Sequence, residues 1–163
     1  MNGGIKMKKI GDYVIYQKEV YKIAEMKEND YTKRMCYTLI PLKDKSLKVT
    51  IPIDNQGIHN LMTKEELNQL IKRIPAIPVI KADDKLIENE YKRLLSEGKR
   101  ENLIAIIKTA YLRNQQRKEN NKKISEKDNR YFQLAEEYLY TEVSVILNCS
   151  IEEAKDYIIK RVE

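Results

Sequence analysis

The residues of this chain that could do chemistry are few and lie far apart in the sequence. The single histidine, His59, could act as a general base or a metal ligand, but one imidazole cannot form a cluster of ligands. The two cysteines, Cys36 and Cys149, do not form a C-x-x-C pair. Cys149 stands next to Ser150 at an expected helix start, where its pKa could fall, although a buried and inert thiol is the commoner outcome.

Paired carboxylates are the remaining candidates for acid–base catalysis. Glu136-Glu137 and Glu152-Glu153 both fall in segments with a helical period, where charged side chains usually form a solvated face. The glycine-rich phosphate loop G-x-x-x-x-G-K-[ST] and the nucleophile elbow G-x-S-x-G are both absent from the sequence. We therefore expect a protein that is not an enzyme and uses no metal or other cofactor. A small nucleic-acid-processing enzyme has no set of residues to support it.

Composition narrows the class of protein. The 163 residues are 42% apolar and 34% charged, which favours a folded chain over a disordered one. The longest apolar runs are far shorter than a membrane span, and no secretion signal opens the chain. Two cysteines cannot form a disulfide framework. We expect a cytoplasmic protein without membrane contact.

The net charge of +6 is unevenly distributed. Residues 108–123 contain six basic side chains and one acidic one, whereas residues 125–163 contain five basic and nine acidic ones. A basic segment beside an acidic one is typical of a protein that contacts a polyanion on one face, and nucleic acid is the usual polyanion. A solvated helix surface would have the same composition, so charge alone leaves both interpretations open.

The first 62 residues show the two-residue period of β-strands. Strands are expected at residues 13–16, 20–26, 36–42 and 47–53, with short polar turns between them. In the last of these strands the alternation predicts a core face made of Leu47, Val49, Ile51 and Ile53. Lys48 and Thr50 then lie on the open face. Four or five short strands of this kind can close a small SH3- or Tudor-like barrel.

After Leu61 the period becomes that of helices. Helix starts, each marked by a side chain that can accept a hydrogen bond from the first turn, are expected at Thr63, Asp83 or Asp84, Ser125 and Ser150. The second helix should end at Gly98, and a third should cover about residues 100–117. The predicted fold is therefore α+β, with a β domain at residues 1–62 and an all-α bundle of about five helices at residues 63–163.

Apolar side chains at helical spacing predict which faces of the last three helices meet in the bundle core. They are Leu103, Ile107, Ala110 and Tyr111 in the third helix, Phe132, Ala135, Leu139, Val143 and Ile146 in the fourth, and Ala154, Ile158 and Val162 in the fifth. Each helix is thus expected to bury a single stripe.

Five segments, in order along the chain, resemble segments of one known family. They are IGDYVIYQKEVYKI, YTLIPLKDKSLKVTIPIDNQGIHNL, TKEELNQLIKRI, LLSEGKRENLIAIIKTAYLRNQQ and ISEKDNRYFQLAEEYLYTEVSVILNCSIEEA. Their order and spacing, over about residues 10–160, are similar to those of the CarD/CdnL family of bacterial RNA-polymerase-binding transcription regulators. The first two segments resemble its N-terminal domain, a module that transcription-repair coupling factors share.

The resemblance implies a Tudor-like N-terminal domain that binds the β subunit of RNA polymerase. It also implies a helical domain that contacts promoter DNA at the upstream edge of the melted bubble and stabilises the open complex. The protein would be a monomer, associated with the nucleoid through the polymerase. The polymerase-binding residues that the resemblance suggests are Lys22, Lys48, Thr50 and Pro52. DNA contacts, mainly to the backbone, are expected from Lys85, Lys92, Arg93, Lys99, Arg100, Lys108 and Arg113.

The chain departs from the family pattern at two places. Relatives have Tyr-Pro and a glycine turn in the first hairpin, where this chain has Tyr16-Gln17 and a charged Lys18-Glu19 step. Relatives also insert a tryptophan near the start of the second helix into a minor-groove base step. This chain has no tryptophan, and the matching place falls near Asp83-Asp84, so we expect wedge insertion to be lost or weakened. The alternative function is a protein-interaction adaptor on RNA polymerase that has lost DNA contact.

Overall fold

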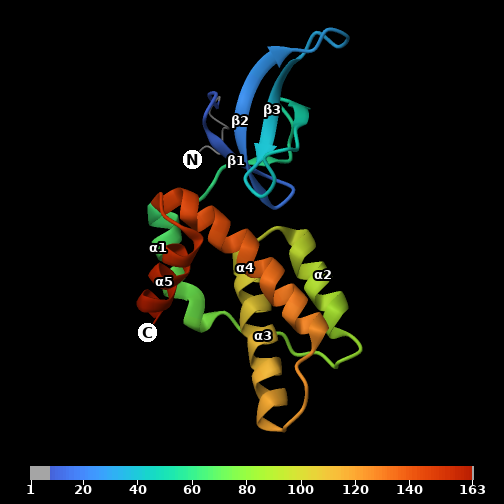
Figure 1. The fold of residues 1–163 in the computed structure, drawn as a ribbon, viewed down its shortest axis with the longest axis vertical. Coiled ribbons are helices and arrows are strands. Elements are labelled where there is room, and N and C mark those ends of the chain that lie inside the picture. Colours follow the sequence, from blue (N-terminus) through green and yellow to red (C-terminus); the bar gives the residue numbers. More distant parts are fainter. Residues whose placement is uncertain (1–7, 163) are drawn as a thin grey trace. The chain divides into compact units, whose positions relative to one another are not determined.

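The computed structural model describes residues 8–162, which fold into two compact units on either side of the Met62–Thr63 bond (Figure 1). The first unit is built from strands and the second from helices, so the fold is α+β, as the sequence predicted. Residues 1–7 and 163 of the predicted domains lie outside the described residues.

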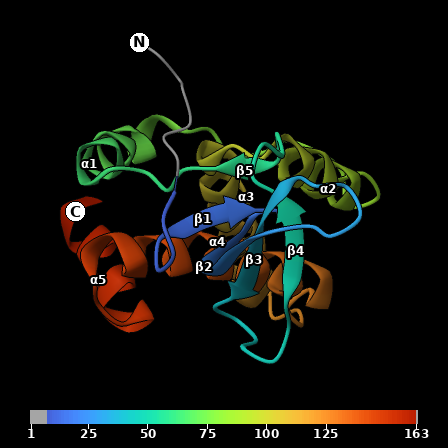
Figure 2. The same ribbon diagram turned by 90° about the horizontal axis from the view of Figure 1, so that it is seen from above.

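The first unit is a sheet of antiparallel strands. They are β1 (Tyr13–Tyr16), β2 (Glu19–Glu28), β3 (Met35–Pro41), β4 (Val49–Pro52) and β5 (Ile58–His59). Their order across the sheet is β4-β3-β2-β1-β5, so β4 and β5 are its edges (Figure 2). The sheet curls into a half-barrel, and a register shift between Ile23 and Glu25 marks a bulge in the long strand β2. The sequence did not predict β5, because a strand of two residues is too short to show a period.

One face of the sheet forms the core of the first unit. Its buried residues are Val14, Tyr21, Ile23, Tyr37, Leu39, Ile51 and Ile58. Of the face predicted for residues 47–53, Ile51 is buried, and Val49 and Ile53 are half-buried against the same cluster. The prediction was wrong for Leu47, which is 54% exposed. Its N–H donates to the Asp44 carbonyl, so Leu47 belongs to the turn ahead of β4.

The hairpin between β1 and β2 closes with a two-residue turn, Gln17-Lys18, between the paired residues Tyr16 and Glu19. The φ angle is 50° at Gln17 and 71° at Lys18. Tight hairpins of this kind favour glycine and asparagine, because other L residues are crowded at positive φ. Where the family pattern has a glycine turn, this chain therefore has a strained hairpin tip.

In the described part of the chain the second unit contains five α-helices and one short 3-10 helix. They are α1 (Lys64–Arg73), η1 (Ile74–Ala76), α2 (Ile87–Glu97), α3 (Arg100–Glu119), α4 (Glu126–Leu147) and α5 (Ile151–Val162). Both predicted capping boxes are confirmed. The Thr63 and Ser150 hydroxyls accept the N–H groups of Glu66 and Glu153, whose side chains accept the N–H groups of Thr63 and Ser150. Gly98 ends α2 at a φ of 70°, as predicted.

The start of α2 differs from the prediction. Neither Asp83 nor Asp84 caps it. The helix begins at Ile87, and its N-cap residue, Leu86, makes no side-chain hydrogen bond to the first turn. The Asp83 carbonyl accepts the N–H groups of Leu86 and Ile87. The Asp84 carboxylate instead accepts a hydrogen bond from Arg113 on α3, a distant ion pair that competes with local capping.

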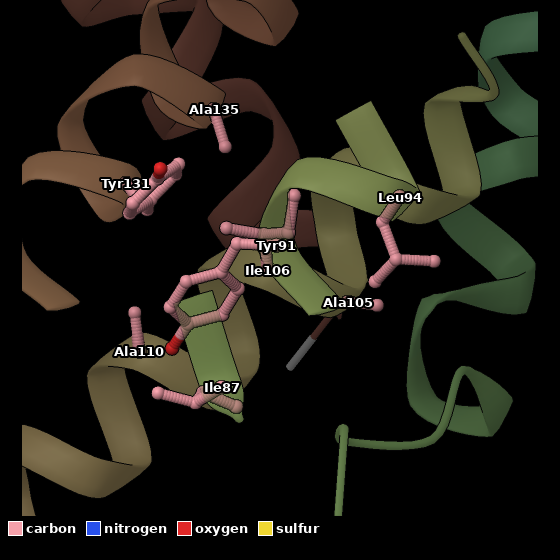
Figure 3. Packing of buried hydrophobic residues seen from close by; sticks show 8 residues of the cluster. All are labelled: Ile87, Tyr91, Leu94, Ala105, Ile106, Ala110, Tyr131 and Ala135. Atoms are coloured by element: carbon pink, nitrogen blue, oxygen red, sulfur yellow. The ribbon is translucent and has the colours of Figure 1, made fainter. Parts of the chain in front are cut away.

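α3 packs against both α2 and α4, so its apolar residues are not confined to one stripe. Its buried residues are Ile104, Ala105, Ile106, Thr109 and Ala110. Figure 3 shows Ala105, Ile106 and Ala110 gathered with side chains of α2 and α4. Leu103 and Ile107 are half-buried against this cluster. The single-stripe prediction was wrong for Tyr111, which is 59% exposed.

The stripes predicted for α4 and α5 hold at their centres and fail towards their ends. The residues confirmed as buried are Ala135, Leu139, Val143, Ala154 and Ile158. Phe132 and Ile146 are only half-buried, and Val162 is exposed in the last turn of α5. α4 buries Tyr131 and Tyr140 instead, because neighbouring helices cover more than one of its sides.

Replacing Lys18 with glycine should stabilise the β1–β2 hairpin. Glycine adopts positive φ without steric cost, so we expect Lys18→Gly to raise the local unfolding free energy by about 0.5–1 kcal/mol. Hydrogen exchange of the β1 and β2 amides measures this quantity. Lys18→Ala is the matched control, because it removes the same charge and keeps the strain. Equal protection of the β1 and β2 amides in the two variants would contradict the strain argument. Gly98→Ala is the reverse change at a positive φ, and it should lower the stability of the end of α2.

Candidate functional site

β4 presents part of its backbone at the open edge of the sheet. It pairs with β3 alone, and the Ile53 N–H donates to the Met35 carbonyl. Bonding to the neighbouring strand alternates along an antiparallel ladder, so the backbone groups of Ile51 also face β3. The N–H and C=O of Thr50 therefore point outward. Pro52 occupies the next outward position, where a missing N–H costs no bond within the sheet.

Three of the four predicted polymerase-binding residues, Lys22, Thr50 and Pro52, share the side of the sheet opposite to the core. Their paired residues on β3 are Ile40, Thr38 and Cys36. Paired residues share a side of the sheet, as do residues two apart on one strand. The Lys22 ammonium lies 5.8 Å from the centre of the Tyr13 ring. Lys48 is exposed and immediately precedes β4.

Four of the seven predicted DNA-binding residues are exposed and lie in or beside α2. Lys85 precedes this helix, Lys92 lies within it, and Lys99 follows it. Arg93 is also exposed, but its guanidinium bonds two glutamates of the same helix, with the shorter distance being 2.8 Å. The lysines are thus the side chains of this group with most freedom to meet a phosphate.

The other three predicted DNA-binding residues bond within the helical unit. Two N–H groups of Arg100 donate to the carboxylate of Glu142, at 2.9 and 2.7 Å. The Lys108 ammonium donates to two backbone carbonyls in and just after η1. Arg113 donates to the fully buried carboxylate of Asp128. All three side chains connect segments of the bundle, a role that counting charges along the sequence did not reveal.

Asp128 joins α2, α3 and α4 through hydrogen bonds. One of its oxygens accepts the Tyr91 hydroxyl at 2.8 Å, and the other accepts the Arg113 guanidinium at 3.1 Å. Its backbone N–H donates to Ser125, which caps α4 as predicted. Burial and the neighbouring carboxylate raise the pKa of Tyr91 well above its ordinary value, so this phenol stays a donor. The Arg113 hydrogen bond lowers the pKa of Asp84 at the exposed end of the network.

Sequence reasoning missed this network. The sequence predicted a helix start at Ser125, and nothing in it singled out Asp128 or Tyr91. The one available signal was an aspartate at a helix position that also faces the bundle core. Its partners lie on two other helices, so no local spacing could have identified them.

Two residues considered for catalysis are His59 and Cys149. His59 is exposed in β5. Burial and the nearby Glu153 raise the pKa of the Cys149 thiol, so the lowered pKa considered from the sequence is not found. Within residues 8–162, no group of three or more His, Cys, Asp or Glu side chains is placed to hold a metal ion. None of the helices in that range combines the length and apolar character that a bilayer crossing demands.

Comparison with known proteins adds no assignment. The chain matches no protein-family model, and no curated protein is significantly similar to it. The resemblance to the CarD/CdnL family therefore rests on the five segments quoted above, and the polymerase-binding and DNA-binding residues stay predictions.

Replacing Asp128 should destabilise the helical unit far more than replacing Asp84, although both carboxylates bind Arg113. Asp128→Asn leaves a poorly exposed guanidinium without its buried counter-charge, and we expect the unfolding free energy to fall by about 3 kcal/mol. Asp84→Asn removes an exposed partner, which normally contributes little. Urea denaturation followed by the helical circular dichroism signal compares the two variants. Similar losses would show that burial does not govern this network.

Proposed function

We propose that this chain is a non-enzymatic transcription regulator. Its N-terminal unit would bind the RNA polymerase β subunit, and its helical unit would modulate the stability of the promoter open complex through DNA contacts. The resemblance to the CarD/CdnL family suggests these partners. The observation that supports the proposal best is the open edge of β4, where the backbone of Thr50 faces outward between Lys48 and Pro52.

The proposal assigns the first unit to the SH3- or Tudor-like barrels. Its curled antiparallel sheet is compatible with that assignment, and β5 pairs with β1 on the side away from β4. The edge strands of such a sheet, β4 and β5 here, have unpaired backbone groups that can accept a partner strand. In our proposal the partner strand pairs with β4.

Strand addition would give the N-terminal unit both affinity and register. Backbone hydrogen bonds at an exposed edge supply affinity, and flanking side chains select the partner. Lys48 and Lys22 would meet acidic side chains of the polymerase and favour one register. Pro52 has no N–H to donate, so it limits the hydrogen bonding that a partner strand can make at its end of β4.

The proposed DNA contacts come mainly from Lys85, Lys92 and Lys99, which lie in or beside α2. Phosphate contacts of this kind confer affinity without sequence preference. At the place where relatives have a wedge, Asp84 is bound by Arg113, and the exposed apolar side chain is Leu86, at 54% exposure. Leucine belongs to the side chains that can enter a base step, but it is smaller than tryptophan. We therefore keep the expectation of a weakened wedge.

Replacing Thr50 with proline tests strand addition directly. The substitution removes the outward N–H of Thr50 and no hydrogen bond within the sheet, and Pro52 shows that proline is accommodated at an outward position of this strand. We expect Thr50→Pro to weaken binding to an isolated β-lobe fragment of RNA polymerase at least tenfold, as measured by fluorescence anisotropy.

Thr50→Val is the matched control, because it removes the hydroxyl and keeps the N–H. It should bind the β-lobe fragment nearly as tightly as the unchanged chain. If Thr50→Pro folds, as checked by circular dichroism, and binds normally, strand addition at β4 is refuted. If the unchanged chain does not bind the fragment at all, the proposed function fails.

Salt dependence tests the DNA contacts. Replacing Lys85, Lys92 and Lys99 with glutamine should reduce the slope of log affinity against log salt by about 2 to 3, because each phosphate contact releases about one counterion. Promoter-fragment binding measured across a range of salt concentrations gives this slope. Glutamine at Lys64, Lys72 and Lys160, exposed lysines of α1 and α5, makes the same change in net charge as a control.

A smaller slope for the Lys85, Lys92 and Lys99 variant than for the control variant would support DNA contact around α2. Equal slopes for the two variants would contradict it. Open-complex lifetime then separates the two functions. A chain that binds the β lobe but leaves the lifetime unchanged would be the adaptor, which has abandoned DNA.

A further inference from the structure

An apolar cavity of about 250 Å³, partly open to solvent, lies in the helical unit where η1, α3, α4 and α5 meet. Its walls consist mostly of aliphatic side chains, among them Ile104, Ile107, Leu139 and Ile158. Two further lining residues, Ile159 and Val162 of α5, are partly exposed to solvent. Apolar cavities of 150 Å³ in proteins already admit a benzene ring, so this one has room for a small aliphatic chain.

Lys108 is the one cationic residue in the lining of this cavity. Its ammonium donates hydrogen bonds to the carbonyls of Ile74, at 2.9 Å, and Ile77, at 2.5 Å. A lysine ammonium has three N–H donors, so two carbonyls leave the third N–H available. No carboxylate of the described residues forms an ion pair with Lys108.

In this arrangement Lys108 has no paired carboxylate among the described residues, and the acidic side chain beside the lining, Glu136, acts on Tyr140. Two carbonyl dipoles offset part of the cost of holding an ammonium against aliphatic walls, but they carry no net charge. The other polar lining group, Tyr140, has a pKa raised to about 12 by burial, with a smaller contribution from Glu136. Its phenol is therefore neutral near pH 7 and supplies no negative charge. A carboxylate from outside the chain would complete the hydrogen bonding and the charge of Lys108.

We propose that the cavity binds a small aliphatic monocarboxylate. The carboxylate accepts the third N–H of Lys108, and the aliphatic chain lies against Ile104, Ile107 and Leu139. Apolar walls with one convergent polar group are the usual composition of a small-molecule site. The proposal is independent of the proposed polymerase and DNA contacts, since Lys108, although expected from the sequence to contact DNA, bonds to carbonyls of the helical unit.

Isothermal titration of the full chain with octanoate tests the proposal. We expect saturable binding with one site. Hexanoate should bind about tenfold more weakly, because it buries two fewer methylene groups. Octan-1-ol has the same chain without the charge and should also bind at least tenfold more weakly. Absence of saturable octanoate binding, or equal affinity for octanoate and octan-1-ol, would overturn the proposal.

Lys108→Met tests the polar contact, because methionine keeps an unbranched stem and removes the ammonium. We expect octanoate affinity to fall about tenfold while octan-1-ol affinity stays the same. Lys64→Met, at an exposed position of α1, is the matched control and should leave both affinities unchanged. Ile107→Trp fills the cavity and should abolish both.

A purely structural role for Lys108 gives a different result. Basic side chains often bond the last carbonyls of a helix, and here the carbonyls belong to the end of α1 and of η1. If Lys108→Met lowers the melting temperature but leaves octanoate affinity unchanged, Lys108 only caps these segments and the proposal is wrong. If Lys108→Met fails to fold, two other results test the proposal. Octanoate must bind at least tenfold more tightly than octan-1-ol, and Ile107→Trp must abolish the binding of both.

Discussion

The arrangement of α2, α3 and α4 depends on the buried carboxylate of Asp128. Asp128 has no exposed surface, and an ionised group at that depth is tolerated only when hydrogen bonds and a counter-charge surround it. Tyr91 of α2 and Arg113 of α3 supply both. The three helices must therefore approach one another with these side chains in register, whereas aliphatic packing alone would accept several arrangements. The same guanidinium reaches Asp84, which holds the segment ahead of α2 and explains why that aspartate does not cap the helix.

The helical unit pairs its buried polar side chains over long distances in the sequence, whereas the sheet has backbone groups at an open edge. Among the described residues, every buried side-chain nitrogen or oxygen has a hydrogen-bond partner, and the helical unit achieves this with long-range pairs such as Arg100 with Glu142. The sheet instead leaves the outward backbone groups of β4 at its edge. An edge strand is a ready template for another strand, and natural proteins usually protect it with proline or charge. β4 has Pro52 at one end and Lys48 just ahead of the other, so the residues that partly protect this edge are the ones that would select a partner strand in the proposed function.

Features that depend on neighbouring residues could be predicted from the sequence. Features that depend on contacts between distant segments could not. The capping boxes at Thr63 and Ser150 and the left-handed Gly98 depend on residues within a few positions, so spacing alone revealed them. Tyr111 and Leu47 were misplaced because burial depends on which elements pack around a helix or where a turn ends. The candidate surface of β4 followed from alternation. The outward direction of the Thr50 N–H required the register, which only the pairing with β3 provides.

The basic residues show why a charge count overstates the contact with a polyanion. Residues 108–123 contain a net charge of +5 by sequence, from six basic side chains and one acidic one. Lys108 and Arg113 bond inside the bundle, and Arg117 lies 3.8 Å from Asp84. The charge that remains for a polyanion is therefore divided between the far end of α3 and the lysines around α2. Because phosphate affinity grows with the number of simultaneous contacts, this division would weaken the proposed DNA binding. The proposed regulator would then rely more on the β4 edge for its place on the polymerase. In our proposal the regulator and the adaptor would therefore differ in the strength of the DNA contact rather than in fold.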